Sequence, residues 1–262
     1  MPAPSDHRLQ REAEFHDRAF TQGTRQATGR FYAVARTSKA AYVDRVLEEC
    51  EGLDVLEYGC GPGSCAPDLV AAGARVTGID ISPEAIDMAR RACAETGASD
   101  GLRLEVMNAE ELAFPAASFD RVCGSGILHH LDLARAASEV VRVLRPRGRA
   151  VFFEPLGHNL LINLYRRRTP ELRTEDEHPL VASDLRFLSR HFGSVSITYH
   201  HLVSLLAAPL WGGALFEPAR AALEGLDRLL LRLPLVRRQA WIAVAVLAEP
   251  LTLSRDEAAG SR

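Results

Sequence analysis

The chain has 262 residues, which suits one α/β domain with insertions better than two independent domains. Hydrophobic residues make up 47% and charged residues 25%, as in ordinary globular proteins. The formal net charge of −3 provides no basic field that could hold a polyanion, so tRNA, rRNA and DNA are disfavoured as partners. We therefore expect a small-molecule substrate and no nucleic-acid partner.

The first fifty residues have the pattern of helices. Two segments, Glu12–Phe20 and Phe31–Cys50, are predicted to be helical, with Tyr42 and Val46 at helical spacing in the second. We expect residues 1–50 to form an N-terminal helical lid.

From residue 51, predicted strands and helices alternate along the chain. The strand candidates are Leu53–Tyr58, Arg75–Ile79, Leu102–Met107, Phe119–Gly124, Gly148–Glu154, Ser194–His201 and Trp241–Ala248. A helix is predicted over Pro83–Thr96, with Ser82 as N-cap and Gly97 as the stop. A second helix is predicted over Leu133–Arg145, where Pro146 ends it. This alternation predicts a parallel sheet with helices on both faces.

Two late segments are rich in leucine and leave several interpretations open. Leu202–Phe216 is apolar but contains Pro209 and is shorter than the roughly 20 residues that a membrane span needs. We expect a buried insertion, a dimer contact or an interfacial helix there. Arg220–Leu235 places arginines among leucines at helical spacing. That pattern is typical of an amphipathic helix packed on the core, or of one lying on a membrane or an apolar substrate.

Five cysteines are scattered along the chain without any Cys-x-x-Cys pair: Cys50, Cys60, Cys65, Cys93 and Cys123. This spacing indicates neither a disulfide framework nor a zinc site, and we expect no bound metal. The polar residues 1–20 lack the apolar core of a signal peptide. Together these features predict a protein of the reducing cytoplasm.

The segment after the first predicted strand carries the clearest functional pattern. Gly59, Gly61 and Gly63 alternate in VLEYGCGPGS, so the backbone there can approach a nucleoside closely. Ser64 stands where the dinucleotide fingerprint has its third glycine, which disfavours a nicotinamide-dependent oxidoreductase. Asp80 ends the next strand, where a carboxylate can accept hydrogen bonds from both ribose hydroxyls.

Together with VTGIDISPEAIDMAR, FDRVCGSGILHHL and VLRPRGRAVFFEP, this loop resembles the class I S-adenosylmethionine-dependent methyltransferases of the ubiquinone/menaquinone-biosynthesis-like type. The resemblance implies a Rossmann-like, mostly parallel seven-stranded sheet whose last strand is antiparallel. Helices would lie on both faces, with helical insertions late in the chain. S-adenosylmethionine would be the cofactor and S-adenosylhomocysteine the product.

The same resemblance divides the chain into a core and a cap. Residues 51–157 would form the cofactor-binding core, which residues 183–201 and 240–250 complete. Residues 158–182 and 202–239 are insertions that we expect to form a substrate cap.

Cofactor contacts are implied at the ends of successive strands. The residues expected to bind the cofactor are Glu57, Gly59, Cys60, Gly61, Gly63, Asp80, Ile81, Asn108, Ala109, Glu110, Gly124 and Ser125. Asp80 should hold the ribose, Ile81 should pack on the adenine, and the backbone at Gly124 and Ser125 should reach the methionine amino group. Asn108 replaces the aspartate usual in the family, which we expect to alter adenine recognition without abolishing it.

Methyl transfer from a sulfonium needs alignment and exclusion of water, and it needs a general base only where the acceptor must lose a proton. The candidate catalytic residues follow the fourth and fifth strands: His129, His130, Glu154 and His158. Each could instead cap a helix or anchor a loop. The arginine run 166–168 could recognise an anionic group on the acceptor, although such runs are usually solvated.

The leading prediction is methyl transfer to oxygen, nitrogen or carbon of a small natural-product or lipophilic acceptor. One alternative is a lipid or quinone methyltransferase that contacts membranes peripherally through residues 202–235. Another is a non-catalytic module that binds S-adenosylmethionine. A homodimer is a further expectation that the sequence leaves open.

Overall fold

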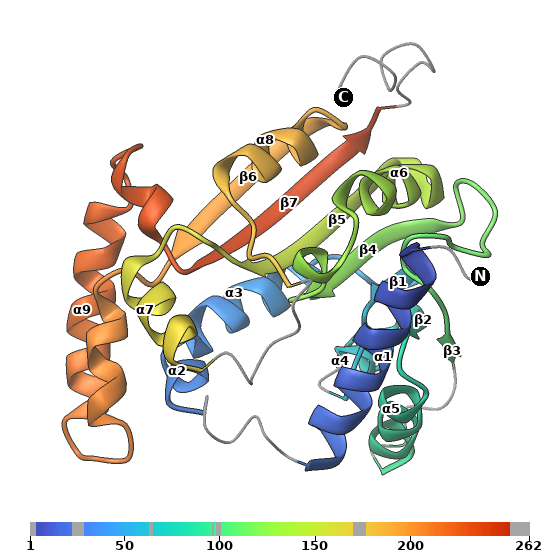
Figure 1. The fold of residues 1–262 in the computed structure, drawn as a ribbon. Coiled ribbons are helices and arrows are strands. Elements are labelled where there is room, and N and C mark those ends of the chain that lie inside the picture. Colours follow the sequence, from blue (N-terminus) through green and yellow to red (C-terminus); the bar gives the residue numbers. More distant parts are fainter. Residues whose placement is uncertain are drawn as a thin grey trace.

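One mixed sheet organises the fold. The computed structural model describes residues 4–22, 29–62, 65–95, 97, 101–169 and 177–251. Within them, seven strands lie in the order β3-β2-β1-β4-β5-β7-β6 (Figure 1). Their bounds are β1 Asp54–Tyr58, β2 Arg75–Asp80, β3 Leu102–Val106, β4 Phe119–Ser125, β5 Leu144–Pro155, β6 Phe192–His200 and β7 Ile242–Pro250. Only β7 runs antiparallel to its neighbours, β5 and β6, so the expected sheet with an antiparallel last strand is confirmed.

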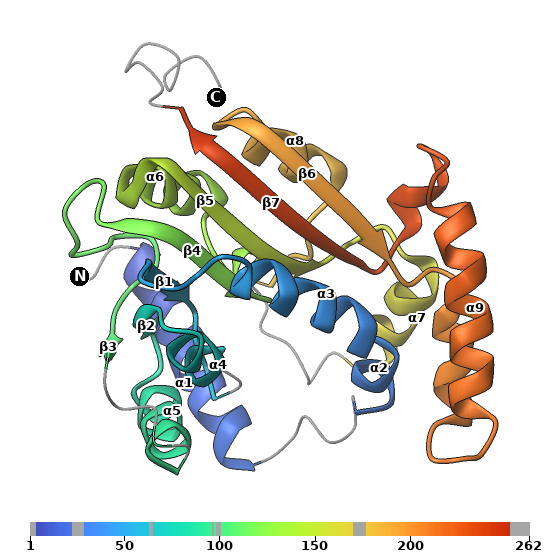
Figure 2. The same ribbon diagram turned by 180° about the vertical axis from the view of Figure 1, so that it is seen from behind.

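Helices cover both faces of this sheet, as the alternating pattern predicts. α3 (Arg36–Leu47) and α4 (Ala66–Ala71) pack on one face, and α6 (Leu133–Val143) and α8 (Ala182–Ser189) pack on the other (Figures 1 and 2). α5 (Pro83–Glu95) packs against β2 and β3.

The central strands bury both of their faces. In β5, Ala150 and Phe152 belong to the apolar layer under α6 and α8, whereas Val151 and Phe153 belong to the layer under α3 and α4. Because successive side chains of a strand point to opposite faces, a strand covered on both sides needs a continuous apolar run. The sequence AVFF meets this requirement.

The N-terminal segment contains three helices where two were predicted. α1 (Pro4–Gln22) lies beside α5 and reaches the loop after β4, where the Arg8 guanidinium donates to the carbonyl oxygen of His130 at 2.8 Å (Figure 1). The single helix predicted over Phe31–Cys50 is divided into α2 (Gly29–Val34) and α3.

One predicted boundary between helix and strand is wrong. The helix predicted over Leu133–Arg145 ends at Val143, and Leu144 already pairs with Phe119 of β4. The residue before a proline avoids helical backbone angles, so the chain preceding Pro146 is extended and lengthens β5 at its start.

Helix α9 (Phe216–Leu230) turns charged side chains inward. Arg220 and Asp227 are only 7% and 4% exposed, whereas Leu226 and Leu229 are 43% and 59% exposed. The interpretation that the leucines of this segment pack on the core is therefore wrong for Leu226 and Leu229.

Hydrogen bonding explains the inverted face. The Asp227 carboxylate accepts the backbone N–H groups of residues 202–204 at 2.7–3.2 Å, and Arg220 pairs with Glu217 and Glu224, each at 2.7 Å. Buried charges need such partners, so these side chains face the protein and leave leucines outside. No helix that the structure describes is long and apolar enough to cross a membrane.

A buried histidine follows β6. His201 Nε2 lies 2.8 Å from Ser38 Oγ, and Nδ1 lies 3.1 Å from Ser204 Oγ. Ser38 donates its single hydroxyl proton to the carbonyl oxygen of Ala35, so the Nε2–H of His201 must donate to Ser38. Nδ1 then accepts from Ser204, and the neutral ring is fully hydrogen-bonded.

We expect His201 to make the protein less stable in mild acid. Burial lowers its pKa from 6.5 to about 4; the nearby His200 and Arg220 act in the same direction, and Asp227 opposes them. Between these two values the unfolded chain binds a proton that the folded chain excludes, so stability falls as the pH falls, by up to about 3 kcal/mol. Denaturant unfolding between pH 7 and pH 4 should show a weaker pH dependence for His201→Gln than for the wild type. The exposed-site control His7→Gln should keep the wild-type slope, and equal slopes for all three proteins would contradict the assignment.

Candidate functional site

A large cavity lies at the carboxyl ends of the parallel strands. Its volume is about 1220 Å³, whereas single small ligands occupy pockets of roughly 300–1,000 Å³. Loops that follow the strands form one side, and α1, α2, α3 and α7 (Leu160–Arg168) form the other. Open α/β sheets bind their ligands at this edge. The cavity therefore has room for two molecules in contact.

The glycine loop after β1 is shaped by backbone conformation and by one carboxylate. Gly59 has φ +68°, and a Cβ at this position would lie 2.7 Å from the Ile127 side chain. The Asp80 carboxylate accepts the N–H of Gly61 through Oδ2 and that of Ser82 through Oδ1, both at 2.9 Å. These contacts fix the carboxylate at the entrance of the loop.

Two neighbouring residues of β1 tie this loop to the rest of the site. The buried Glu57 accepts the N–H of Cys65 at 2.6 Å, which holds the start of α4. Tyr58 donates its hydroxyl to the carbonyl oxygen of Ala109, and burial raises the pKa of this phenol.

Most of the residues expected to bind the cofactor line the cavity. They are Glu57, Gly59, Cys60, Gly61, Asp80, Ile81, Asn108, Ala109 and Ser125. Gly63 lies outside the described residues. Gly124 is behind the wall, where a Cβ would lie 2.9 Å from a backbone carbonyl. Glu110 is also behind it, bound to the Arg8 guanidinium and to the N–H of Asp132.

Lys39 is a site residue that the sequence reasoning missed. It lies on α3 and donates from Nζ to Ser125 Oγ at 2.9 Å. The same ammonium lies 4.6 Å from the ring centre of Tyr42 and 5.6 Å from that of Phe153. Nothing in the local sequence indicates that this helix reaches the end of β4; the only signal is that Lys39 is the sole lysine of the chain.

Glu154 organises the turn after β4. Its Oε1 accepts the N–H groups of Ile127 and Leu128 at 3.0 and 2.9 Å, and its Oε2 lies 2.8 Å from Nδ1 of His129. Burial raises the pKa of the Glu154 carboxyl to about 7, while the N–H groups act in the opposite direction. The carboxyl thereby sets the position of the short helix η2 (Leu128–His130).

The four candidate catalytic residues divide into two groups. His129 and His130 line the cavity, whereas Glu154 and His158 are not part of its wall. His158 accepts the N–H of Ala182 at 3.3 Å, next to the start of α8. The structure thus brings the two histidines to the wall and places Glu154 directly behind His129.

Aromatic side chains from three elements line the far end of the cavity. The ring centre of Phe31 in α2 lies 4.6 Å from that of Tyr165 in α7 and 6.1 Å from that of Trp241, just before β7. Arg166 is the member of the arginine run that lines this region; the next two arginines are exposed.

The covering segments contribute unequally to the wall. Residues 158–182, expected as part of a substrate cap, contribute Ile162, Tyr165, Arg166 and Glu177. Residues 202–239 contribute none of the lining side chains. From α1 come Arg8, Leu9, Glu12 and Phe15.

This strand order, with a glycine loop and an acidic residue meeting at the carboxyl edge, is a Rossmann-like arrangement. Residues 56–152 match the methyltransferase domain family, which confirms the resemblance inferred from the motifs.

Two curated relatives match about half of the chain. The ubiquinone biosynthesis O-methyltransferase of Methylocella silvestris is 37% identical over 125 residues, 47% of this chain and 47% of that protein. The aklanonic acid methyltransferase of Streptomyces sp. strain C5 is 37% identical over 115 residues, 42% of this chain and 52% of that protein. The chain spans about half the length of these relatives.

A solved structure extends the likeness of fold beyond the matched domain. The geranyl diphosphate C-methyltransferase of Streptomyces coelicolor superposes with a TM-score of 0.61 over 82% of this chain and 79% of that chain. The sequences are 15% identical, so this likeness concerns the fold.

Proposed function

We propose that this protein transfers a methyl group from S-adenosylmethionine to a small-molecule acceptor. The observation that carries the proposal is one continuous cavity, in which the Asp80 carboxylate and glycine loop at one end face an aromatic wall at the other. The relatives named for ubiquinone biosynthesis and aklanonic acid support a small-molecule substrate. A reducing cytoplasmic setting is part of the proposal, and the five free cysteine thiols support it.

The residues at the glycine loop fit an adenosine-containing cofactor. Asp80 presents a fixed carboxylate suited to two ribose hydroxyls, while Ile81 and Ala109 supply apolar surface for the base. Asn108 uses Oδ1 to accept the N–H of Glu110 at 2.9 Å, so its amide is held in the wall. When bound, the cofactor supplies a methyl group activated by its sulfonium.

The protein contributes binding, alignment and exclusion of water. α1 covers the cavity through Phe15 and Leu9 and is held in place by Arg8. The aromatic wall suits a flat or lipophilic acceptor, and Arg166 suits an anionic substituent on it.

Release of a labelled methyl group into product tests the proposal. Purified protein would be incubated with methyl-tritiated S-adenosylmethionine and a panel of hydroxylated, amino and carbon-acid aromatics, with and without isoprenoid chains. We expect the wild type to methylate at least one acceptor of the panel, and we expect the Asp80→Asn variant to fail to methylate that acceptor. Tight binding of S-adenosylhomocysteine without transfer to any acceptor would favour the non-catalytic binding module instead.

Lys39 should hold the carboxylate of the methionine part of the cofactor. Its ammonium is bonded to Ser125, beside the backbone where the methionine amino group is expected. Lys39→Met should weaken S-adenosylhomocysteine binding about tenfold or more, because it removes one charge-assisted hydrogen bond. Binding of 5′-methylthioadenosine, which lacks the carboxylate, should be unchanged. Calorimetric titration with both ligands checks this, and an equal loss for both would contradict the role.

We further propose, as a second candidate property, that the outer face of α9 makes the protein a peripheral membrane enzyme. Its outward leucines continue beyond the helix to Leu233 and Leu235, which are 54% and 76% exposed. Arg228 and Arg232 lie among these leucines in the sequence, the combination that binds an anionic lipid surface.

Vesicle flotation distinguishes membrane contact from self-association. The protein should float with vesicles of mixed phosphatidylglycerol and phosphatidylcholine, and the double variant Leu229→Glu, Leu233→Glu should not. Substitution of an exposed valine in the edge strand β3, Val106→Glu, serves as the control. A wild type that stays unbound and sediments as a dimer, while the double variant is monomeric, would assign the face to a homodimer instead.

A further inference from the structure

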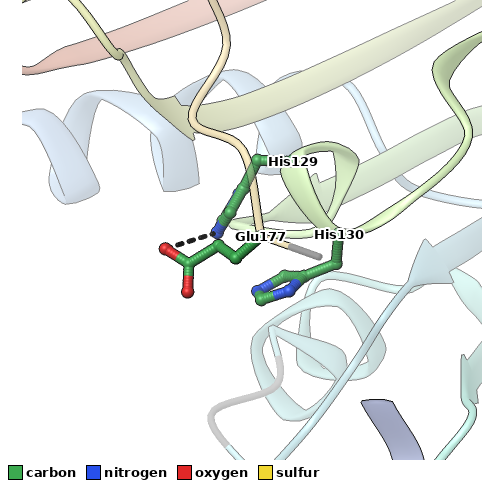
Figure 3. A group of neighbouring side chains, drawn as sticks. All are labelled: His129, His130 and Glu177. Carbon is green, nitrogen blue, oxygen red and sulfur yellow. Dashed lines mark ion pairs between the residues drawn. The ribbon is translucent and has the colours of Figure 1, made fainter. Parts of the chain in front are cut away.

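Three side chains with metal-binding chemistry converge on the cavity wall. His129 and His130 lie on η2, and Glu177 approaches them from a distant part of the chain (Figure 3). One nitrogen of each imidazole and one oxygen of Glu177 all lie within 4.8 Å of one another. Nε2 of His129 is 4.0 Å from Oε1 of Glu177, and the ring centres of the histidines are 4.2 Å apart.

Backbone hydrogen bonds bring Glu177 to the histidines. The N–H of His178 donates to the carbonyl oxygen of His129 at 3.0 Å, and the N–H of Leu180 donates to that of Pro155 at 3.1 Å. The segment that begins with Glu177 therefore runs along the ends of β4 and β5, so the cluster does not depend on side-chain rotamers alone.

Each histidine has a buried carboxylate beside its Nδ1 atom. Oε2 of Glu154 lies 2.8 Å from Nδ1 of His129, and Oε2 of Glu12 lies 3.2 Å from Nδ1 of His130. These carboxylates are only 3% and 5% exposed. Metal-binding histidines usually direct one nitrogen to a carboxylate, which orients the ring and leaves the other nitrogen for the ion.

We propose that His129, His130 and Glu177 bind one divalent transition-metal ion of the first row. Two imidazoles and one carboxylate suit Zn²⁺ or Fe²⁺ rather than Mg²⁺, which prefers oxygen ligands. At bond lengths of about 2.0–2.2 Å, tetrahedral ligand atoms are about 3.3 Å apart, so the 4.0 Å between His129 and Glu177 must close by about 0.7 Å. No pair of ligand atoms, all within 4.8 Å of one another, must close by more than about 1.5 Å. The ion also neutralises a region where three carboxylates gather, those of Glu12, Glu154 and Glu177.

The expectation that no metal is bound rested on the spacing of the cysteines, and these ligands are of another kind. With three protein ligands the ion keeps open positions toward the cavity. An oxygen atom of the acceptor would bind at one of these open positions, and the ion would thereby orient the acceptor. This role rests on the proposed methyl transfer, whereas binding of the ion does not.

Direct metal titration tests the site without reference to activity. Protein freed of its affinity tag and dialysed against chelator, then against buffer, would be titrated with Co²⁺ by visible absorption and with Zn²⁺ by calorimetry. We expect one equivalent to bind, with Co²⁺ absorption bands typical of imidazole and carboxylate coordination. His130→Gln and Glu177→Gln should each weaken binding of the ion about 100-fold or more. Loss of a residue that only orients a metal ligand already weakens binding by up to about 100-fold, and loss of a ligand should weaken it at least as much.

A second pair of adjacent histidines provides the matched control. His201 uses both ring nitrogens within the fold, and His200 does not line the cavity, so His200→Gln should bind the ion as the wild type does. Circular dichroism confirms folding of each variant. The absence of saturable binding by the wild type, or an equal effect of His200→Gln, would overturn the proposal. Metal binding without methyl transfer would keep the site and reject the function, and transfer in metal-free protein would reject the metal's role toward the acceptor.

Discussion

Replacing Asp80 by asparagine is expected to weaken binding of S-adenosylhomocysteine about 100-fold. The carboxylate is fixed by the N–H groups of Gly61 and Ser82, so it is already oriented before a ligand arrives. Charge-assisted hydrogen bonds contribute about 1.5–3 kcal/mol each, and asparagine retains only one neutral acceptor oxygen. Two weakened bonds to ribose hydroxyls therefore account for a loss of this size.

Isothermal titration with S-adenosylhomocysteine measures the effect. Asp87→Asn is the matched control, because Asp87 lies on the outer surface of the adjoining helix α5, where it pairs with Arg90 at 2.9 Å. The control should bind as the wild type does. An Asp80→Asn variant that is folded and binds within about threefold of the wild type would show that ribose recognition lies elsewhere.

The strands and the cofactor end of the site could be predicted because their signals are local. Buried parallel strands are rich in apolar residues, the glycine loop directly follows β1, and Asp80 is the last residue of β2. Their meeting at one edge follows from the topology of parallel strands. Pro146 indicates locally that Arg145 is not helical, whereas the end of the helix at Val143 depends on the tertiary pairing of Leu144 with Phe119.

Contacts in the site between distant parts of the chain could not be predicted in the same way. Lys39 reaches Ser125, and Glu177 reaches His129, across 86 and 48 residues of chain, and no spacing rule links such positions. Which face of α9 is buried could not be predicted for a different reason. Its pattern of leucines and arginines does not reveal that Asp227 has backbone partners inside the protein.

Replacing Glu154 by alanine is expected to lower the free energy of unfolding by about 3–5 kcal/mol and the melting temperature by about 10 °C. The carboxyl, whose residue is only 2% exposed, accepts hydrogen bonds from the N–H groups of Ile127 and Leu128 and contacts Nδ1 of His129. Alanine leaves these buried polar groups without partners, and each such group costs about 1–3 kcal/mol.

Thermal unfolding of a short series separates this structural effect from the loss of a charge. Glu154→Gln keeps the volume and an acceptor oxygen for Ile127 and Leu128, but it turns an amide N–H₂ toward His129, so an intermediate melting temperature is expected. The exposed Glu95→Ala on α5 should melt with the wild type. If Glu154→Ala also melted within about 2 °C of the wild type, the turn after β4 would not depend on this carboxyl. The orientation of His129 toward the cavity would then need another cause, because Glu154 is the group that holds the ring from behind.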